Sequence, residues 1–314
     1  TATDKIQVKL YPGATATASV TNGTPFYITG DYYKIHGFTG STTYSSSVKT
    51  SYVHANGATG LEVSNLKVTA AAFHGDYNNG CISTEHSNAS NIHHNYFGDC
   101  TVSTGTLDNG AGIIWLDDED IATEGADHQA SFNTIYYNAY SNAVNGACWR
   151  TKHGVDLGDS GANGHRVNYS TCVNSRYGIA INSSGIRFKR NAVFNDGTGN
   201  DLGASFQIIA RIWVDGFTTP HEDNIIEDST FYNMSMLWWQ EPSYTSAAEK
   251  LTFRNNVVWD NDAAYGLGND EGIISIDPYG SNAQKTQLET NSSLAINNNC
   301  YWNASAVLNF NYYG

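Results

Sequence analysis

Short runs of alternating apolar and polar residues recur along the chain, and each run carries an Asn or Ser at a bend. This pattern is typical of short β-strands with tight turns, because alternation places successive side chains on opposite faces of a strand. The runs return about every 20 to 45 residues, which is the period of a solenoid built from stacked repeats. They occupy residues 60–68, 89–97, 129–135, 164–172, 185–193, 223–231, 250–258 and 295–301.

A second family of strands lies between these runs, and several of its members read Gly-Ile-x-Ile or a close variant. Its members occupy residues 80–86, 112–118, 146–153, 178–182, 206–215, 236–241 and 272–277. One strand of each family per repeat predicts an all-β, right-handed parallel β-helix of about ten to twelve coils. A β-propeller would show four strands per blade at a steadier period, and a sandwich gives no reason for copied runs.

The Asn residues at the bends have an expected structural role. Their amides can satisfy backbone groups from coil to coil, and Asn tolerates the left-handed backbone conformation. We therefore expect them to form ladders at a corner of the solenoid. Since stacked repeats build one elongated body, we expect residues 1–314 to form a single parallel β-helix domain. The sequence opens directly on a strand and turn at 6–13, so we expect the N-terminal cap to lie outside it.

Composition agrees with short strands and tight corners, since the chain has 30 Gly, only 5 Pro and no long helical period. No run of about 18 apolar residues occurs, so we expect no membrane span. The net charge of −14 argues against nucleic-acid binding, which needs a basic face. No Lys or Arg occurs between Lys67 and Arg150, so this stretch is acidic, whereas the segment from Arg150 onward is basic. This asymmetry indicates either solvated loops of opposite sign or a cation site beside an anion-binding cleft.

The five cysteines include no metal-type C-x-x-C pair. Cys148 and Cys172 lie about one coil apart, which is close enough for a disulfide. The alternative, which we favour, is that both are buried free cysteines in a stacked core. An odd number of cysteines leaves at least one thiol free or paired outside the chain.

Two segments carry a family resemblance. Residues 24–38 resemble a coil common near the N-termini of secreted right-handed parallel β-helix proteins of the pectate-lyase-like superfamily, and residues 298–302 resemble a late coil of the same proteins. The resemblance implies this fold over nearly the whole chain. It leaves the activity open, because the superfamily includes lyases, hydrolases, epimerases, phage tailspikes and proteins without catalysis.

Charged and aromatic residues recur at one phase of the second strand family. Such a row suits a bound sugar polymer, since aromatic rings stack on apolar sugar faces and polar groups take the hydroxyls and carboxylates. Taken singly, each tryptophan can equally be core and each charge solvated. The substrate-binding candidates are Glu85, His86, Arg176, Asn182, Trp213, Trp238 and Glu241.

The centre of this row of charged and aromatic residues is the segment 149–154. A lyase acting on a polyuronate needs a base, a cation that neutralises the carboxylate and a proton donor for the leaving oxygen. We assign Lys152 as the base, because a nearby Arg150 and desolvation would lower its pKa. Arg150, Arg176 or Arg211 could neutralise the carboxylate, and His153 could donate the proton.

The resemblance implies one cofactor. Similar β-helix lyases use Lys or Arg as the base, often with Ca²⁺ held by neighbouring carboxylates. Asp117, Asp118 and Asp120 lie one coil before Lys152, so together with Glu85 they are the Ca²⁺ candidates, although such an acidic run can also be a solvated turn.

These candidates define three functional hypotheses. The first is a secreted or cell-surface protein that processes an acidic polysaccharide, acting as a lyase by β-elimination. The second is a non-catalytic glycan-binding or structural β-helix, such as a surface fibre, adhesin or phage tail component, and it allows an oligomer. The third is a glycoside hydrolase, which needs two carboxylates across the bond; Asp117 or Asp118 with Asp156, Asp159 or Asp215 could supply them.

Overall fold

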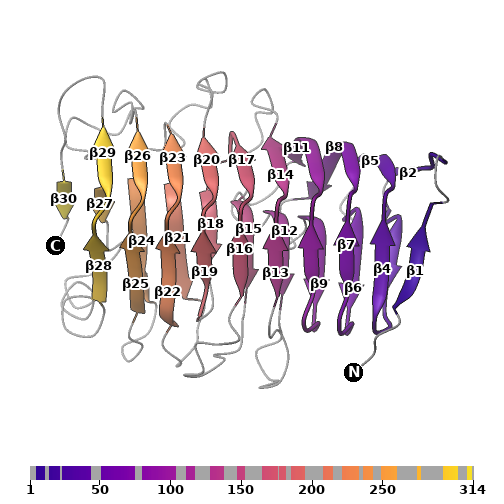
Figure 1. Cartoon of the computed structure of the whole chain (residues 1–314), viewed down its shortest axis with the longest axis horizontal. Coiled ribbons are helices and arrows are strands. Elements are labelled where there is room, and N and C mark those ends of the chain that lie inside the picture. Colours follow the sequence, from indigo (N-terminus) through magenta and orange to yellow (C-terminus); the bar gives the residue numbers. More distant parts are fainter. Residues whose placement is uncertain are drawn as a thin grey trace.

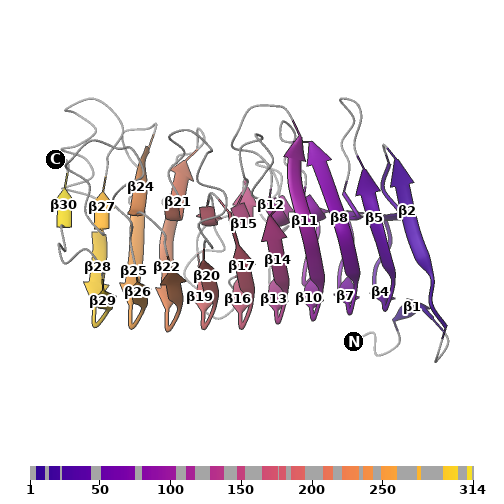
Figure 2. The same ribbon diagram turned by 90° about the horizontal axis from the view of Figure 1, so that it is seen from above.

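The computed structural model is a stack of parallel β-coils, viewed from the side in Figure 1 and from above in Figure 2. Two ten-stranded sheets and one eight-stranded sheet, here called A, B and C, run along the stack, and every strand pair within them is parallel. The right-handed parallel β-helix predicted from the repeats is thereby confirmed. The structure describes residues 5–10, 14–21, 23–43, 51–74, 80–103, 111–116, 128–137, 147–152, 165–175, 177–181, 185–194, 208–214, 221–232, 236–242, 249–259, 274–276, 293–302 and 310–312.

In each coil a strand of sheet A is followed by a tight turn, here called the corner, and then by a strand of sheet B. Sheet A holds the strands that precede this corner. They are β1 Ile6–Lys9, β4 Tyr33–His36, β7 Glu62–Ser64, β10 Asn91–His93, β13 Gln129–Ser131, β16 Arg166–Asn168, β19 Arg187–Lys189, β22 His221–Glu227, β25 Glu249–Arg254 and β28 Ser293–Asn297. Sheet B holds the strands that follow it. They are β2 Thr17–Thr21, β5 Thr39–Thr43, β8 Lys67–His74, β11 Tyr96–Ser103, β14 Thr134–Tyr137, β17 Thr171–Val173, β20 Ala192–Phe194, β23 Thr230–Tyr232, β26 Val257–Trp259 and β29 Cys300–Trp302. Each Asn-bearing run therefore covers two strands and the corner between them.

Sheet C holds six of the seven strands of the second family, together with two earlier strands that the pattern missed. Its members are β3 Phe26–Ile28, β6 Val53–Asn56, β9 Gly80–Glu85, β12 Ala111–Leu116, β15 Ala147–Lys152, β18 Tyr177–Ile181, β21 Ile208–Val214 and β24 Met236–Pro242. The seventh strand, β27 (Ile274–Ile276), instead pairs with β30 (Phe310–Tyr312) in a separate two-stranded sheet. A coil thus contributes three strands, one to each sheet, where the sequence pattern indicated two.

The core is made of stacked side chains, one from each strand, that repeat at the same register. In sheet A, Val63, Ile92, Ala130, Val167, Phe188, Ile226 and Phe253 are aligned and buried. In sheet B, Val68, Phe97, Ile135, Cys172, Val193, Phe231 and Val258 form the matching row. Burial of such apolar rows is the main force that holds coil on coil.

A tight corner of two residues joins each strand of sheet A to the next strand of sheet B from β7 onward. The first corner residue takes the left-handed conformation with φ between 50° and 56°, and these residues are Asn65, His94, Phe132, Tyr169, Arg190, Asp228, Asn255 and Asn298. The second is an Asn or Ser in the later corners, and here the predicted ladder is found. The Asn133 amide donates to the Ile92 carbonyl at 2.9 Å, and the Asn133 carbonyl accepts from the Asn95 backbone at 3.2 Å.

The ladder residue and the left-handed residue are therefore different, although we expected Asn to serve both purposes. The ladder Asn residues are buried and satisfy backbone groups of the neighbouring coils. The left-handed position is exposed and accepts Phe132, Tyr169 and Arg190. Placing such residues there costs about 1–2 kcal/mol each, so the ladder beside them has to hold the corner in place.

A disulfide links Cys148 of β15 to Cys172 of β17, with a Cα–Cα distance of 6.1 Å. Our preference for free cysteines at this pair was therefore wrong. Both residues lie in the core cluster, and the inward positions of sheets B and C face each other there, which brings the two thiols within reach. Of the other described cysteines, Cys81 is buried and Cys300 is exposed.

Candidate functional site on sheet C

The outer face of sheet C carries the residues that the sequence singled out. Cys148 and Trp149 of β15 both belong to the core, so side chains alternate only from Trp149 onward. Beyond that point Trp149 and Thr151 are buried on the core side, and Arg150 lies on the opposite face, in line with the exposed Tyr27. Parallel register aligns Arg150 with one residue of each neighbouring strand. We call these aligned positions the arginine row: Tyr27, His54, Ser83, Ile114, Arg150, Ala180, Arg211 and Trp238.

A second set of aligned positions lies two residues further along the strands. We call it the lysine row, and its aligned positions are Asn56, Glu85, Leu116 and Lys152. Successive strands are about 4.8 Å apart and residues i and i+2 are about 6.5 Å apart. Glu85 and Lys152, with one strand between them, are therefore separated by about 10 Å along the stack. The same spacing separates Arg150 from Arg211.

Arg150 is almost completely buried, with 1% of its surface exposed. It is one of the largest fully buried side chains of the described residues, and it has an interaction partner. A guanidinium removed from water requires such a partner, since an unpaired buried charge is very costly. Its neighbours in the arginine row, Ile114 and Ala180, are buried too. The middle of this outward face is thus shielded from solvent.

The N-terminal part of the face holds an acid–base pair. His54 Nε2 lies 3.3 Å from Glu85 Oε2, a contact that runs diagonally from the arginine row to the lysine row. The exposed Tyr27 ring stacks on the His54 ring, with centroids 5.2 Å apart and planes 11° from parallel. His86 follows Glu85 directly and has a left-handed backbone with φ of 49°, where the preceding coil has Gly57. A bulky residue in this conformation stores strain, as residues at functional sites often do.

Tyr27 and His54 belong to this face, yet the sequence reasoning missed them. Their strands, β3 and β6, lack the Gly-Ile signature that identified the later strands of sheet C. For β6 the phase of the repeat was the available signal, because this strand stands at the same offset before an Asn-bearing run as β9 does.

The remaining site candidates divide into two groups. Arg211, Trp213, Trp238 and Glu241 lie on β21 and β24, and of these Arg211 and Trp238 are direct neighbours in the arginine row. Six further candidates lie outside the described residues: Asp117, Asp118, Asp120, His153, Arg176 and Asn182. Among the residues that the structure does describe, no group of three or more His, Cys, Asp or Glu side chains could hold a metal ion.

Charged residues on the outer face of sheet A are paired with one another. Glu62 contacts Lys34, Lys5 at 3.1 Å and His93 at 3.4 Å. Burial alone would raise the pKa of Glu62, but the two lysines outweigh it and lower that pKa to about 2. Further along, Glu227 binds Lys189 and Arg254. Each of these two carboxylates faces two cationic side chains, so both clusters keep a surplus of positive charge on sheet A.

Comparison with protein-family models, curated proteins and solved structures gave no match for the chain. The parallel β-helix consequently rests on the chain's own geometry, and the superfamily resemblance remains a resemblance. No helix of the described part of the chain is long and apolar enough to cross a membrane.

Proposed function

We propose that this protein binds an acidic polysaccharide along the lysine row of sheet C, beside the buried middle of the arginine row, and cleaves it by β-elimination. The observation that supports the proposal is the register of Arg150, Lys152 and Arg211, because parallel pairing aligns these three cationic residues in two neighbouring rows of sheet C. Two of these positions, Arg150 and Arg211, are separated by one strand, so the positive charge extends along the direction in which a sugar chain would lie.

In the proposed reaction, the Lys152 amine removes the proton from the sugar carbon next to the carboxylate. The electron pair of that C–H bond forms a double bond to the adjacent carbon, whose bond to the glycosidic oxygen breaks. The leaving oxygen keeps the electron pair of the broken C–O bond and takes a proton, for which His153 is the candidate donor. Arg211 would neutralise the carboxylate while charge builds up on it.

Arg150 acts as a positioning residue in this scheme, because a side chain that is 1% exposed does not touch the substrate. A fixed positive charge two residues from Lys152 favours the neutral amine that a base requires. Glu85 and His54 stand about 10 Å or more along the stack from Lys152, so they would bind the hydroxyls of a neighbouring sugar unit. Asp117, Asp118 and Asp120 would supply carboxylate oxygens to a Ca²⁺ ion if one takes part.

A secreted location fits the disulfide between Cys148 and Cys172, since such bonds persist in oxidising compartments. We therefore place the proposed activity outside the cell or at its surface.

The test is a panel of polyuronates, including polygalacturonate, alginate, chondroitin sulfate and hyaluronan, followed by ultraviolet absorbance of the unsaturated product. We expect absorbance to rise on at least one polymer and to be abolished in Lys152→Ala, while circular dichroism shows an intact fold. Lys67→Ala, on sheet B, is the matched control and should keep full activity. No unsaturated product on any polymer would rule out the lyase, and new reducing ends without a double bond would identify a hydrolase.

A non-catalytic glycan-binding role is the second candidate, and the burial of Arg150 favours it. A guanidinium that already has a protein partner can serve to hold the coil rather than to support chemistry. Binding to one of the polyuronates without turnover would select this alternative.

A further inference from the structure

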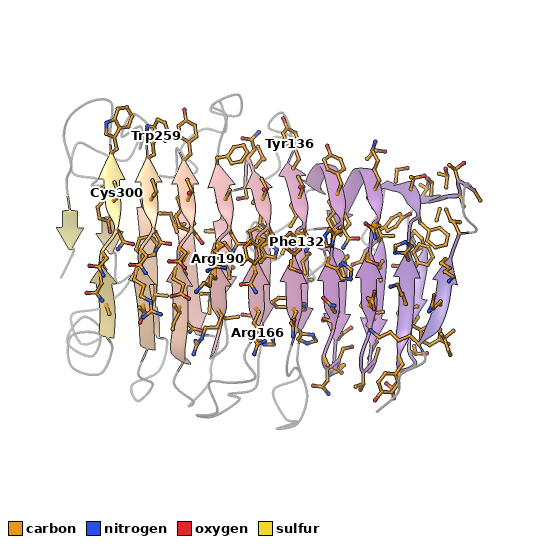
Figure 3. All side chains as sticks on the ribbon, viewed as in Figure 1. Phe132, Tyr136, Arg166, Arg190, Trp259 and Cys300 are labelled. Atoms are coloured by element: carbon orange, nitrogen blue, oxygen red, sulfur yellow. A yellow bond between two sulfur atoms is a disulfide. The ribbon has the colours of Figure 1, made fainter. Side chains whose placement is uncertain are left out.

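The outer face of sheet B carries aromatic residues on successive coils in the C-terminal half of the stack. Parallel register aligns one outward residue of each strand from β14 to β29. We call these positions the aromatic row: Tyr136, Val173, Phe194, Tyr232, Trp259 and Trp302. Figure 3 shows Tyr136 and Trp259 toward the same edge of the molecule, well separated from Phe132 and Arg190 at the corner.

The row beside it is made largely of hydroxyl-bearing and small apolar residues. Its aligned positions, two residues earlier on the same strands, are Thr134, Thr171, Ala192, Thr230, Val257 and Cys300. Neither row contains an Asp, Glu, Lys or Arg. In a chain with a net charge of −14, and beside a sheet A whose outer face holds several ion pairs, such an uncharged face is a distinct surface.

The aromatic row is exposed at its C-terminal end, where Trp259 and Trp302 keep 48% and 49% of their surface accessible. Their rings meet edge to face, with centroids 5.4 Å apart and planes 89° from parallel, and Tyr232 meets Trp259 in the same way. Neither indole lies flat on its neighbour, so these contacts leave much of the ring faces uncovered. Clustered apolar groups left in water are costly and usually mark a binding surface.

The stacked rings of the corner residues His94, Phe132 and Tyr169, here called the corner stack, provide a contrast within the same chain. Its rings lie flat on one another, with planes 22° and 5° from parallel, and Arg190 lies over Tyr169. Those ring faces are already covered, although Phe132 is as exposed as the two tryptophans. The corner stack therefore stabilises the packing of coil on coil, and it offers a ligand only ring edges.

We propose that the aromatic row binds an uncharged polysaccharide chain lying along the long axis of the solenoid. The apolar C–H faces of sugar rings pack against indole and phenol rings, and the neighbouring threonine hydroxyls can donate to and accept from sugar hydroxyls. The repeat of about 4.8 Å from strand to strand presents the same contact again along an extended polymer. A polyuronate would find no cation here, so this surface differs in ligand class from sheet C and does not depend on the activity proposed for it.

The test is affinity electrophoresis of the full chain through gels that contain hydroxyethylcellulose, xyloglucan or galactomannan. We expect at least one polymer to retard the protein, at high salt as well as low. The double variant Trp259→Ala/Trp302→Ala should bind at least about tenfold more weakly. Phe132→Ala removes an equally exposed aromatic residue and should bind like the wild type, as should Lys152→Ala.

Three results would overturn the inference. The first is no retardation of the wild type by any neutral polymer. The second is equal loss of binding in Phe132→Ala, which would indicate a general effect of removing aromatic residues. The third is a wild-type dimer in light scattering that Trp302→Ala converts to a monomer, which would make this face a contact between two copies of the chain.

Discussion

The imidazole rings of His128 and His165 are stacked in the core, with centroids 5.2 Å apart and planes 13° from parallel. The Trp115 ring stacks on both, and all three side chains are buried. Burial lowers the pKa of His165 to about 4. Burial, reinforced by the nearby His165, also holds the pKa of His128 well below its usual range. The folded protein therefore contains two neutral imidazoles that the unfolded chain would protonate near pH 6.5.

The histidine pair predicts acid sensitivity in a defined window. Because the folded pKa values are lowered, the folded state binds fewer protons than the unfolded state, and stability falls as the pH drops from about 6.5 toward 4. At His165 alone the shift corresponds to roughly 3 kcal/mol. Urea unfolding at a series of pH values measures this slope. We expect His128→Phe/His165→Phe to flatten it, while His94→Phe at the exposed corner retains it.

The disulfide predicts both a thiol count and a loss of stability. Titration of the denatured, unreduced protein with a thiol reagent should detect no more than three thiols from five cysteines, since Cys148 and Cys172 are joined. Replacing both by Ala should lower the free energy of unfolding by about 3 kcal/mol, because the bond closes a loop with a sequence separation of 24. Five thiols in the denatured protein would contradict the pairing.

The two corner positions should respond differently to substitution. Asn191→Ala removes an amide that donates to the Val167 carbonyl at 2.8 Å and a carbonyl that accepts from the Ser170 backbone at 2.9 Å. Because it leaves two buried backbone groups unsatisfied, it should cost about 2–4 kcal/mol. Asn255→Gly, at the exposed left-handed position, should change stability by less than about 1 kcal/mol, because Gly adopts that backbone freely. Equal losses in thermal unfolding would show that the ladder is not the stabilising element.

Arg150 should act on stability as well as on activity. Arg150→Met leaves its partner group without the guanidinium, and a buried polar group left unsatisfied costs about 1–3 kcal/mol. Arg150→Lys keeps the charge and should recover part of the loss. Lys67→Met, on an exposed side chain, is the control and should stay within about 0.5 kcal/mol of the wild type. A fully stable Arg150→Met variant would show that the buried guanidinium contributes nothing to the fold.

Much of the fold is predictable from the sequence, because each coil packs on its neighbours in the same way and therefore shows the same pattern of residues. Each Asn-bearing run has to bury one apolar residue on either side of a corner, so the phase of the pattern identifies strands of sheets A and B. The third strand of each coil is less constrained, and its early members β3 and β6 escaped notice. The pattern at 272–277 also predicts a strand of this third set, but β27 pairs with β30 in the separate two-stranded sheet.

The site was less predictable, because alternation tells only which face a residue points to and not what covers that face. Alternation predicts that Arg150 shares a strand face with Lys152, but it does not predict the burial of Arg150, which depends on the rest of the fold. Pairing of Cys148 with Cys172 depends on how sheets B and C face each other across the core. Contact between His54 and Glu85 depends on the register of β6 against β9, which local sequence does not contain.

The two-residue corner limits how this molecule can change over evolution. A single residue inserted there would turn every following outward side chain of that strand inward, so length changes are expected at the other two corners. Duplication or loss of a whole coil preserves the corner and leaves all downstream strands in phase. Chains of this kind can therefore become longer or shorter by whole coils, and the aromatic row can be extended coil by coil without redesign of the core.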